Sequence, residues 1–286
     1  MTCSGMLRFS QSLSLLVFLL AVGCASGPPS PGAAMSSQSG SLVQDDPSSG
    51  QEVPPGAQSQ TQEQDTRPGV GVWPFSNGGS FGSDPWDYES LGIGLQQMLI
   101  TELSLNSGLR LVERSRLREI IEELELGQGG YIDPSTTASV GRLVQARYMI
   151  VGSFVDANGT MRFDARIDDV ETGEVLTETA AKVQADRDDV LDMVIDLGIK
   201  LVEAANLPTL PEEIVEERKE LNYPPEAVQL YSRALRREER GDLPGMTDLL
   251  RQLATDFPQH IEGRQMLEQY GVGDPLQVDL SSRRSK

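Results

Sequence analysis

The sequence predicts an α/β (α+β) fold, in which helices flank a mixed sheet with an antiparallel meander, followed by a small all-α helical hairpin. Three patterns support this prediction. Short strand patterns first alternate with helical periodicity, three strand patterns joined by turns come next, and two apolar helical stripes lie near the carboxyl end. The α/β part, residues 69–207, has the length of one ordinary domain.

The first strand and helix are predicted between residues 69 and 105. Residues 69–75 are typical of a buried strand that stops at Pro74, and a Gly-rich loop follows from Ser76 to Asp87. Leucines at helical spacing then predict an amphipathic helix from about Tyr88 to Leu105. The loop has the context of a phosphate cradle, but it lacks Gly-Lys-Ser/Thr, and Asp84 and Asp87 would repel an anion. We therefore interpret it as a turn.

A second strand and two helices are predicted between residues 109 and 145. Leu109 to Glu113 is a short strand pattern, Ser115 is suited to cap the helix that follows, and Gly127 to end it. Asp133-Pro134 is a strong start signal for another helix, which should run to about Gln145.

Residues 148–206 predict the antiparallel meander and its closing helix. The apolar run from Tyr148 to Val155 is typical of a central strand, and Asn158-Gly159 is a strong hairpin signal. The next strand alternates between an apolar and a charged face. The remaining predicted elements are a turn at Thr172-Gly173, a strand from Glu174 to Gln184 and a helix from Asp186 to Asn206.

Charged residues in this domain have more than one interpretation. Asp168, Asp169 and Glu171 have the composition of a cation site or an acid-base pair, but the spacing of a calcium loop is absent, so we expect solvated turn residues. On the charged strand face we expect modest cross-strand ion pairs from Arg162, Asp164, Arg166 and Asp168. Arg114, at a strand-to-helix junction, either anchors a loop or a neighbouring subunit or makes a local salt bridge.

Residues 208–270 predict a charged helical connector, 208–222, and then a helical hairpin over 224–258. The hairpin has the residue spacing of one tetratricopeptide-type helix-turn-helix, and a generic helical hairpin is the alternative. Because one such unit cannot bury its own apolar face, we expect it to dock on the α/β domain or to hold a partner. The candidate docking residues are Leu230, Ala234, Gly241, Met246, Leu250 and Leu253. The tail, 271–286, is expected to be disordered.

The amino-terminal segment resembles a bacterial lipoprotein export signal. An apolar run from Leu13 ends in Val22-Gly23-Cys24, and it is too short to span a bilayer as a permanent helix. We expect cleavage between Gly23 and Cys24 and lipidation of Cys24, which would anchor the chain to a membrane. An ordinary signal peptide with a coincidental Cys is the alternative, and either Met1 or Met6 is the true start.

Residues 24–68 follow as the lipidated Cys and a Ser-, Gly-, Pro- and Gln-rich tether, expected to be disordered, with a root-mean-square reach of roughly 35–40 Å. In lipoproteins resembling this one, a residue other than Asp after the Cys, here Ala25, goes with sorting to the outer membrane. The expected location is therefore the outer membrane, with the folded part in the periplasm.

The composition gives no support for an enzyme, a metal site or a cofactor site. The chain has two Cys, of which Cys3 lies in the cleaved segment and Cys24 would be lipidated, and one His, His260. We accordingly predict no catalytic residue, no metal and no cofactor. The net charge of −19 disfavours nucleic acid and anionic lipid surfaces as partners.

Six local phrases of the 69–207 block follow one another in a characteristic order. They are Val72-Trp73-Pro74-Phe75, Leu111 to Leu117, Asp133-Pro134, Gly141-Arg142-Leu143, Ile150-Val151-Gly152-Ser153 and Arg166 to Glu174. In this order the phrases resemble the CsgG-like family of curli secretion lipoproteins. The flagellar outer-membrane lipoprotein and the amino-terminal part of the translocation protein TolB are similar in architecture.

The resemblance implies an outer-membrane lipoprotein whose periplasmic domain assembles into rings or docks other envelope or secretion proteins. Our first hypothesis is a non-enzymatic component for assembly or secretion of a curli-like surface structure. The alternatives are a ring-forming secretion channel and a flagellar-type or cell-envelope accessory lipoprotein. A pore needs additional long hairpins of alternating residues, and only Thr160 to Asp169 alternates cleanly, within a strand that the domain itself needs.

Overall fold

The structure is a computed structural model. It describes residues 65–82, 86–124, 126, 133–221 and 223–271, and all of these fall within one compact unit of the chain. The expected export signal, the lipidation site Cys24, residues 25–64 of the tether and residues 272–286 of the tail lie outside the described residues. No helix among the described residues is long and apolar enough to cross a membrane.

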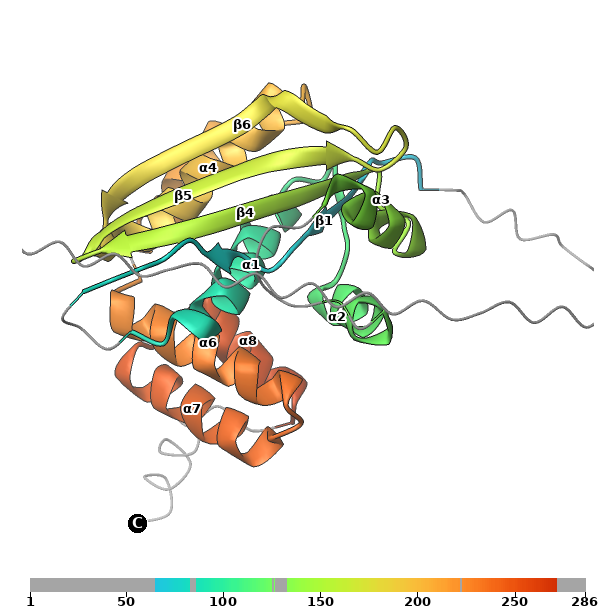
Figure 1. Cartoon of the computed structure of the whole chain (residues 1–286). Coiled ribbons are helices and arrows are strands. Elements are labelled where there is room, and N and C mark those ends of the chain that lie inside the picture. The colour runs from blue at the N-terminus through green and yellow to red at the C-terminus, as the bar shows by residue number, and fades with distance from the viewer. Residues whose placement is uncertain (1–64, 83–85, 125, 127–132, 222, 272–286) are drawn as a thin grey trace, which may run out of the picture. The chain divides into compact units, whose positions relative to one another are not determined.

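The predicted fold class is confirmed, because the described chain forms a mixed sheet flanked by helices (Figure 1). The strand order is β3-β1-β4-β5-β6, and the short β2 also pairs with β4. Strand β1 runs parallel to β3 and β4, whereas β4, β5 and β6 are antiparallel. The strands are β1 (Gly69–Val72), β2 (Ser76–Asn77), β3 (Arg110–Leu111), β4 (Tyr148–Ala157), β5 (Thr160–Asp169) and β6 (Val175–Asp186).

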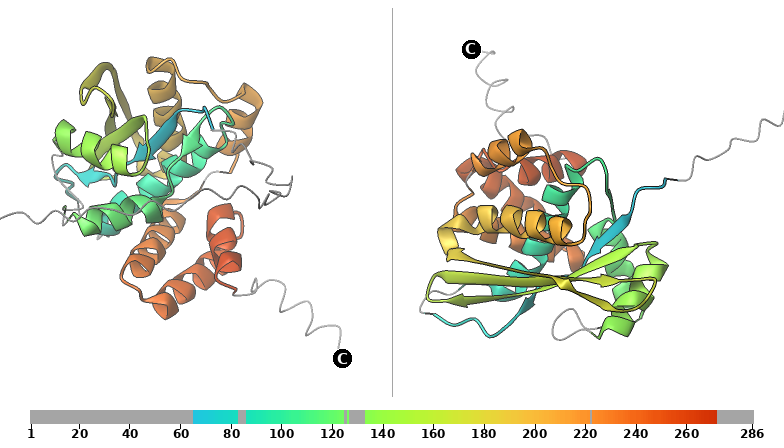
Figure 2. Two further views of the ribbon diagram at one scale, coloured as in Figure 1. Left: turned by 90° about the vertical axis from the view of Figure 1, so that its right-hand side faces the viewer. Right: turned by 90° about the horizontal axis from the view of Figure 1, so that it is seen from above.

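Helices cover the two faces of the sheet unequally (Figure 2). One face packs along its length on α1 and α4, with Phe154 and Phe163 in the core between them. On the other face, α2 and α3 cover only the end beside β1, around Trp73 and Met149. The helices of this domain are α1 (Tyr88–Ser104), α2 (Arg114–Glu123), α3 (Pro134–Leu143) and α4 (Val190–Ala204), the last preceded by a 3₁₀ turn at Arg187–Asp189.

Helix α1 begins where the sequence predicts, but it is buried on two faces instead of one. Asp87 caps it by accepting a hydrogen bond from the Ser90 backbone N–H at 3.1 Å. Leu95 faces the main core, whereas Ile93 packs into the core of the carboxyl-terminal helices. The helix therefore lies between the sheet and that second helical group.

Residues 76–82 of the Gly-rich loop form more regular structure than the turn that the sequence predicts, while Asp84 lies outside the described residues. The first two residues of the loop form β2, and Phe81 bridges to Ala157 at the far end of β4. Asn77 organises the turn between them, because its Oδ1 accepts hydrogen bonds from the N–H groups of Gly79 and Ser80 at 3.1 and 2.8 Å. Gly79 has φ +102°, which explains a glycine at this position.

The starts of α2 and α3 test two capping predictions. For α3 the prediction is confirmed, because Asp133 accepts a hydrogen bond from the Ser135 N–H at 2.8 Å and Pro134 occupies the first turn. For α2 it is wrong: Glu113, with extended backbone angles, is the N-cap residue, and Ser115 lies inside the first turn. Gly127, the predicted end of this helix, lies outside the described residues.

The meander follows its predicted turns. Asn158 and Gly159 have φ values of +53° and +94°, as a two-residue hairpin requires, and Gly173 has φ +74° in the second turn. A β-bulge between β5 and β6 lies beside Arg166, where the register shifts between Ala165 and Ile167. The Thr179 hydroxyl compensates by accepting a hydrogen bond from the Ile167 N–H at 2.9 Å.

Three further helices form the carboxyl-terminal group, after a connector helix α5 (Glu212–Lys219). The predicted hairpin is α6 (Pro225–Glu239) and α7 (Leu243–Asp256), with Gly241 at φ +71° in its turn. Helix α8 (Ile261–Gln269) packs against this hairpin. The assignment of the α6–α7 hairpin as a tetratricopeptide unit stays a prediction.

Candidate interaction surface

The single histidine is a structural residue in this fold. His260 is fully buried, stacks on Tyr223 with ring centroids 4.2 Å apart, and caps α8 by accepting the Gly263 N–H at its Nδ1 at 3.2 Å. Burial lowers its pKa to about 4, so the ring is neutral at pH 7. Among the residues that the structure describes, no group of three or more His, Cys, Asp or Glu side chains has the arrangement of a metal site.

The acidic cluster at the end of β5 is partly buried, which corrects the expectation of solvated residues. Asp168 is fully buried and pairs with Arg166 at 2.9 Å, and Asp169 pairs with Arg147. Burial alone would raise the pKa of Asp169, but the Thr172 N–H and Arg147 lower it below its ordinary value. Only Glu171 is solvated, because β5 continues pairing with β4 through Asp169 and holds both aspartates inside the fold.

Ion pairs on the charged face of β5 run along the strand, whereas we expected them between strands. Arg162 pairs with Asp164 at 2.6 Å, and Arg166 pairs with Asp168. The register explains the difference, because uncharged residues lie opposite most of these side chains on β4 and β6. Residues two apart on a strand share a face, so each of these charges has an opposite charge beside it on β5, and Asp164 also lies opposite Lys182 of β6.

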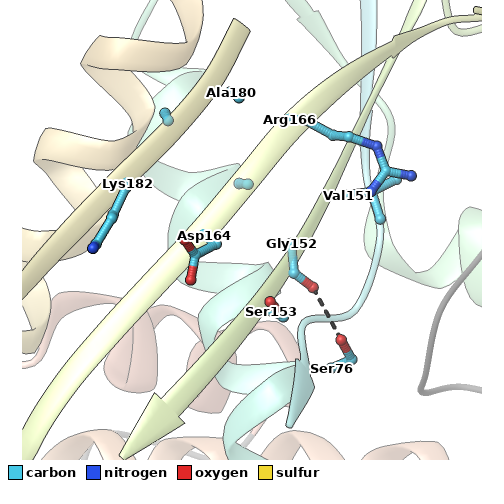
Figure 3. A pocket seen from close by; sticks show the side chains of 10 residues that line it. Ser76, Val151, Gly152, Ser153, Asp164, Arg166, Ala180 and Lys182 are labelled. Atoms are coloured by element: carbon cyan, nitrogen blue, oxygen red, sulfur yellow. Dashed lines mark hydrogen bonds between the residues drawn. The ribbon is translucent and has the colours of Figure 1, made fainter. Parts of the chain in front are cut away.

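The outward face of β4, β5 and β6 is the principal surface without a helical cover in the described structure (Figure 1). It carries a groove of about 450 Å³ that crosses all three strands (Figure 3). Its lining combines the charged side chains of Asp164, Arg166 and Lys182 with small residues, among them Ser153 beside Asp164 and Ala180 beside Arg166.

The bulge in β6 helps to form this groove. It places Ala180, an exposed small residue, next to Arg166 on the strand beside it. On the inner face, by contrast, Gly152 leaves room for the ring of Phe75, which a Cβ at this position would overlap. The groove therefore has a firmly packed floor, and its mixture of charges and small residues is suited to polar contacts with a protein surface.

Arg114 joins the α/β domain to the carboxyl-terminal helices. Its guanidinium is buried and pairs with Glu238 and with Glu239, the latter at 2.6 Å, while its Nε lies 3.3 Å from Gln97 Oε1. Of the two interpretations of this residue, the structure supports a long-range anchor, here within the same chain. The sequence around Arg114 gives no indication of its partners, which lie more than 120 residues away.

A second buried ion network connects the same two parts. Arg218 of α5 pairs with Glu102 of α1 at 2.6 Å and with Glu262 of α8 at 2.7 Å. The Tyr223 hydroxyl donates a hydrogen bond to Glu262 at 2.8 Å. Burial raises the pKa of Glu102 although Arg218 opposes this effect. These contacts link three helices, so the carboxyl-terminal group is held to α1 by charge as well as by apolar packing.

The predicted docking residues of the hairpin face inward. All of the apolar ones are buried in a cluster that includes Ile93 of α1, so the α/β domain covers the apolar face of the hairpin. At the contact, Gly94 of α1 lies against Ser232 of α6, and a Cβ at Gly94 would overlap the Ser232 hydroxyl. Gly94 is the sequence signal for this close approach, because a glycine inside a helix usually has a packing reason. Gly92 has a different neighbour, Phe75 of the α/β domain.

The fold and this surface thus define an α/β domain with a partly open sheet, and a group of carboxyl-terminal helices that packs against helix α1 of that domain. Residues 55–158 match the family model described as curli production assembly/transport component CsgG. The family resemblance inferred from the sequence is confirmed over this segment.

Solved structures with similarity to this chain include several bacterial domains. The LpoB C-terminal domain from Escherichia coli is 19% identical, with 42% of this chain and 82% of that chain covered and a TM-score of 0.33. Lipoprotein GNA1162 from Neisseria meningitidis is 13% identical (41% and 79% covered, TM-score 0.33), and the PelC dodecamer from Paraburkholderia phytofirmans is also 13% identical (50% and 90% covered, TM-score 0.31). Comparison with curated protein sequences gives no significant match.

Proposed function

We propose that this chain is a non-enzymatic outer-membrane lipoprotein that acts in the assembly or secretion of a curli-like surface structure. Its CsgG-like domain would face the periplasm and bind copies of itself or other envelope proteins. The observation that carries the proposal is the uncovered outward face of β4, β5 and β6 with its groove, in a segment that overlaps the CsgG-family match.

The membrane anchor in this proposal rests on the sequence. An apolar run that ends in Gly23-Cys24, followed by a long polar segment, is the arrangement of a lipidated and tethered domain. Acyl chains on Cys24 would hold the domain at the membrane, and the tether would let the folded part reach partners in the surrounding space.

The non-enzymatic assignment is supported by what the chemically suited side chains do in the fold. His260 is a buried helix cap, Asp168 is a buried partner of Arg166, and Asp169 binds a turn and Arg147. Each of these groups is engaged in contacts that hold the fold together, and none lines the groove.

The outward sheet face supports docking for two physical reasons. It is broad and built on paired strands, so little conformational entropy is lost in ordering this face when a partner binds. Its charged side chains and small residues also offer specific polar contacts without a large apolar patch, which suits an assembly that must stay soluble before it forms.

Light scattering tests whether the protein binds copies of itself. The lipidated protein is extracted from membranes in mild detergent, and its molar mass is measured. Ala180→Arg places a long cationic side chain in the groove, and Gln252→Arg on exposed α7 is the matched control. We expect a discrete multiple of the monomer for the wild type and the control, and a smaller species for Ala180→Arg. A monomer in all three samples would refute self-association and the secretion-channel alternative, leaving the docking of other proteins.

A further inference from the structure

A depression lined by four arginines lies at the opposite end of the sheet from the tip of the β4–β5 hairpin. It has a volume of about 780 Å³ and is lined by Arg67, Arg110, Arg142 and Arg147, with Glu171 as the acidic lining residue. Such a concentration of positive charge is unexpected in a chain with 43 acidic and 24 basic residues, whose net charge by itself disfavours anionic lipid surfaces as partners. The depression is a local exception to that net charge.

Two of these guanidinium groups form no ion pair within the described structure, although the Asp65 carboxylate is near enough to Arg110 to interact with its charge. Arg110 donates to the Gln145 backbone oxygen, and Arg142 donates to the Val170 backbone oxygen at 3.2 Å. Within the described ranges neither makes an ion pair, in contrast to Arg67, which pairs with Asp65, and Arg147, which pairs with Asp169 and Glu171. Arg110 and Arg142 therefore keep positive charge and unused N–H donors.

The backbone around the depression is shaped to hold these side chains. A Cβ at Gly69 would overlap the guanidinium of Arg110, so the glycine lets this side chain cross β1. Arg147 lies over the Tyr148 ring, 5.1 Å from its centroid. Part of this positive charge complements the carbonyl end of α3, where Gln145 lies at φ +56°, but a single arginine suffices for that contact.

The position of the depression relative to the membrane anchor suggests the source of a ligand. Thr66 and Arg67 line it, so the chain that leads back to Cys24 leaves the described domain at this point. Because the tether joins the domain beside the depression, this end of the domain lies closer, on average, to the membrane than the other surfaces do. Planar guanidinium groups bind phosphate oxygens through paired hydrogen bonds, and lipid headgroups present such oxygens.

We propose that this arginine cluster is a binding site for phosphate groups, with anionic phospholipid headgroups as the source. The site would orient the domain on the membrane and leave the outward face of β4, β5 and β6 free for partners. Phosphate binding at this site does not depend on the proposed docking function. The expected lipidation of Cys24 serves only to bring the headgroups near the site.

Vesicle flotation tests the proposal with the mature chain from Cys24 carrying Cys24→Ser, so that no acyl chain contributes. The probes are vesicles of phosphatidylcholine alone and of phosphatidylcholine with phosphatidylglycerol, and inorganic pyrophosphate is measured separately by calorimetry. We expect salt-sensitive binding to the anionic vesicles alone and competition by pyrophosphate. Arg110→Gln with Arg142→Gln should weaken vesicle binding about 25-fold, at roughly fivefold for each arginine.

The matched control is Arg116→Gln with Arg251→Gln, which removes the same charge from exposed helix positions and should bind as the wild type does. If the wild type binds pyrophosphate but not vesicles, and the Arg110/Arg142 double variant loses the pyrophosphate binding, the phosphate site is supported. Its ligands are then free phosphate compounds and not lipid headgroups. Failure of the wild type to bind either probe, or equal binding by the two double variants, would overturn the proposal. Pyrophosphate competition uses the wild type alone, so it decides the matter even if the variant misfolds.

Discussion

Replacing Arg114 with Ala should loosen the carboxyl-terminal helices from the α/β domain. The Arg114 side chain is 6% exposed, and its partners Glu238 and Glu239 are 18% and 9% exposed, so the substitution leaves two largely buried carboxylates without their cation. Removing one partner of a buried ion pair costs about 3–5 kcal/mol, and we take about 3 kcal/mol because Glu238 retains some contact with water. For a domain of this size that corresponds to a fall in Tm of about 6–12 °C.

The assay is thermal unfolding followed by circular dichroism, with Arg116→Ala as the matched control. Arg116 and its partner Glu119 are 56% and 60% exposed, so this change should cost below about 1 kcal/mol. A double-mutant cycle of Arg114→Ala with Glu239→Gln should give a coupling free energy of about 1–3 kcal/mol. Equal losses for Arg114→Ala and Arg116→Ala, or additivity in the cycle, would refute the role of Arg114 as an anchor.

Three further predictions concern other elements of the same structure. Burial lowers the pKa of His260 in the folded state to about 4, from 6.5. The neutral ring therefore stabilises the fold fully above pH 6.5, and this stabilisation, about 3 kcal/mol in all, is lost as the pH falls toward 4. His260→Asn keeps a capping oxygen and should flatten that part of the curve of stability against pH. An unchanged slope in urea titrations at several pH values would contradict this. Gly94→Ala should destabilise the fold by about 1–3 kcal/mol because its Cβ overlaps Ser232, and Ser232→Gly should restore most of the loss, whereas additive losses in urea unfolding would contradict the close contact. Thr179→Val leaves the buried Ile167 N–H without an acceptor and should cost about 1–3 kcal/mol, far more than Thr177→Val at an exposed site, a comparison that thermal unfolding of the two variants decides.

The elements that local chemistry determines are those that the sequence predicts well. Asp133-Pro134 begins a helix and Asn158-Gly159 forms a hairpin because each signal acts through its own backbone and its immediate neighbours. The alternation in β5 likewise predicts its inner face correctly, since Met161 and Phe163 are fully buried.

Features that depend on distant residues could not be predicted in this way. Local patterning at Arg114 contains no information about Glu238 and Glu239, and the charged strand of β5 does not specify which residues lie opposite it on β4 and β6. The open sheet face also emerges only from the topology, because it depends on helices α1 and α4 lying together on one side. Gly94 of α1 was the overlooked signal for the second buried face of this helix, where it lies against Ser232.

Photocrosslinking in living cells tests the docking role of the outward sheet face most directly. A photoreactive amino acid is placed at position 180 in the groove and, as the control, at position 252 on exposed α7, in the full-length chain. The account predicts a discrete adduct of higher mass from position 180 and none from position 252, with mass spectrometry identifying either a second copy or another envelope protein. The absence of any adduct from position 180, or the same adducts from the two positions, would contradict it.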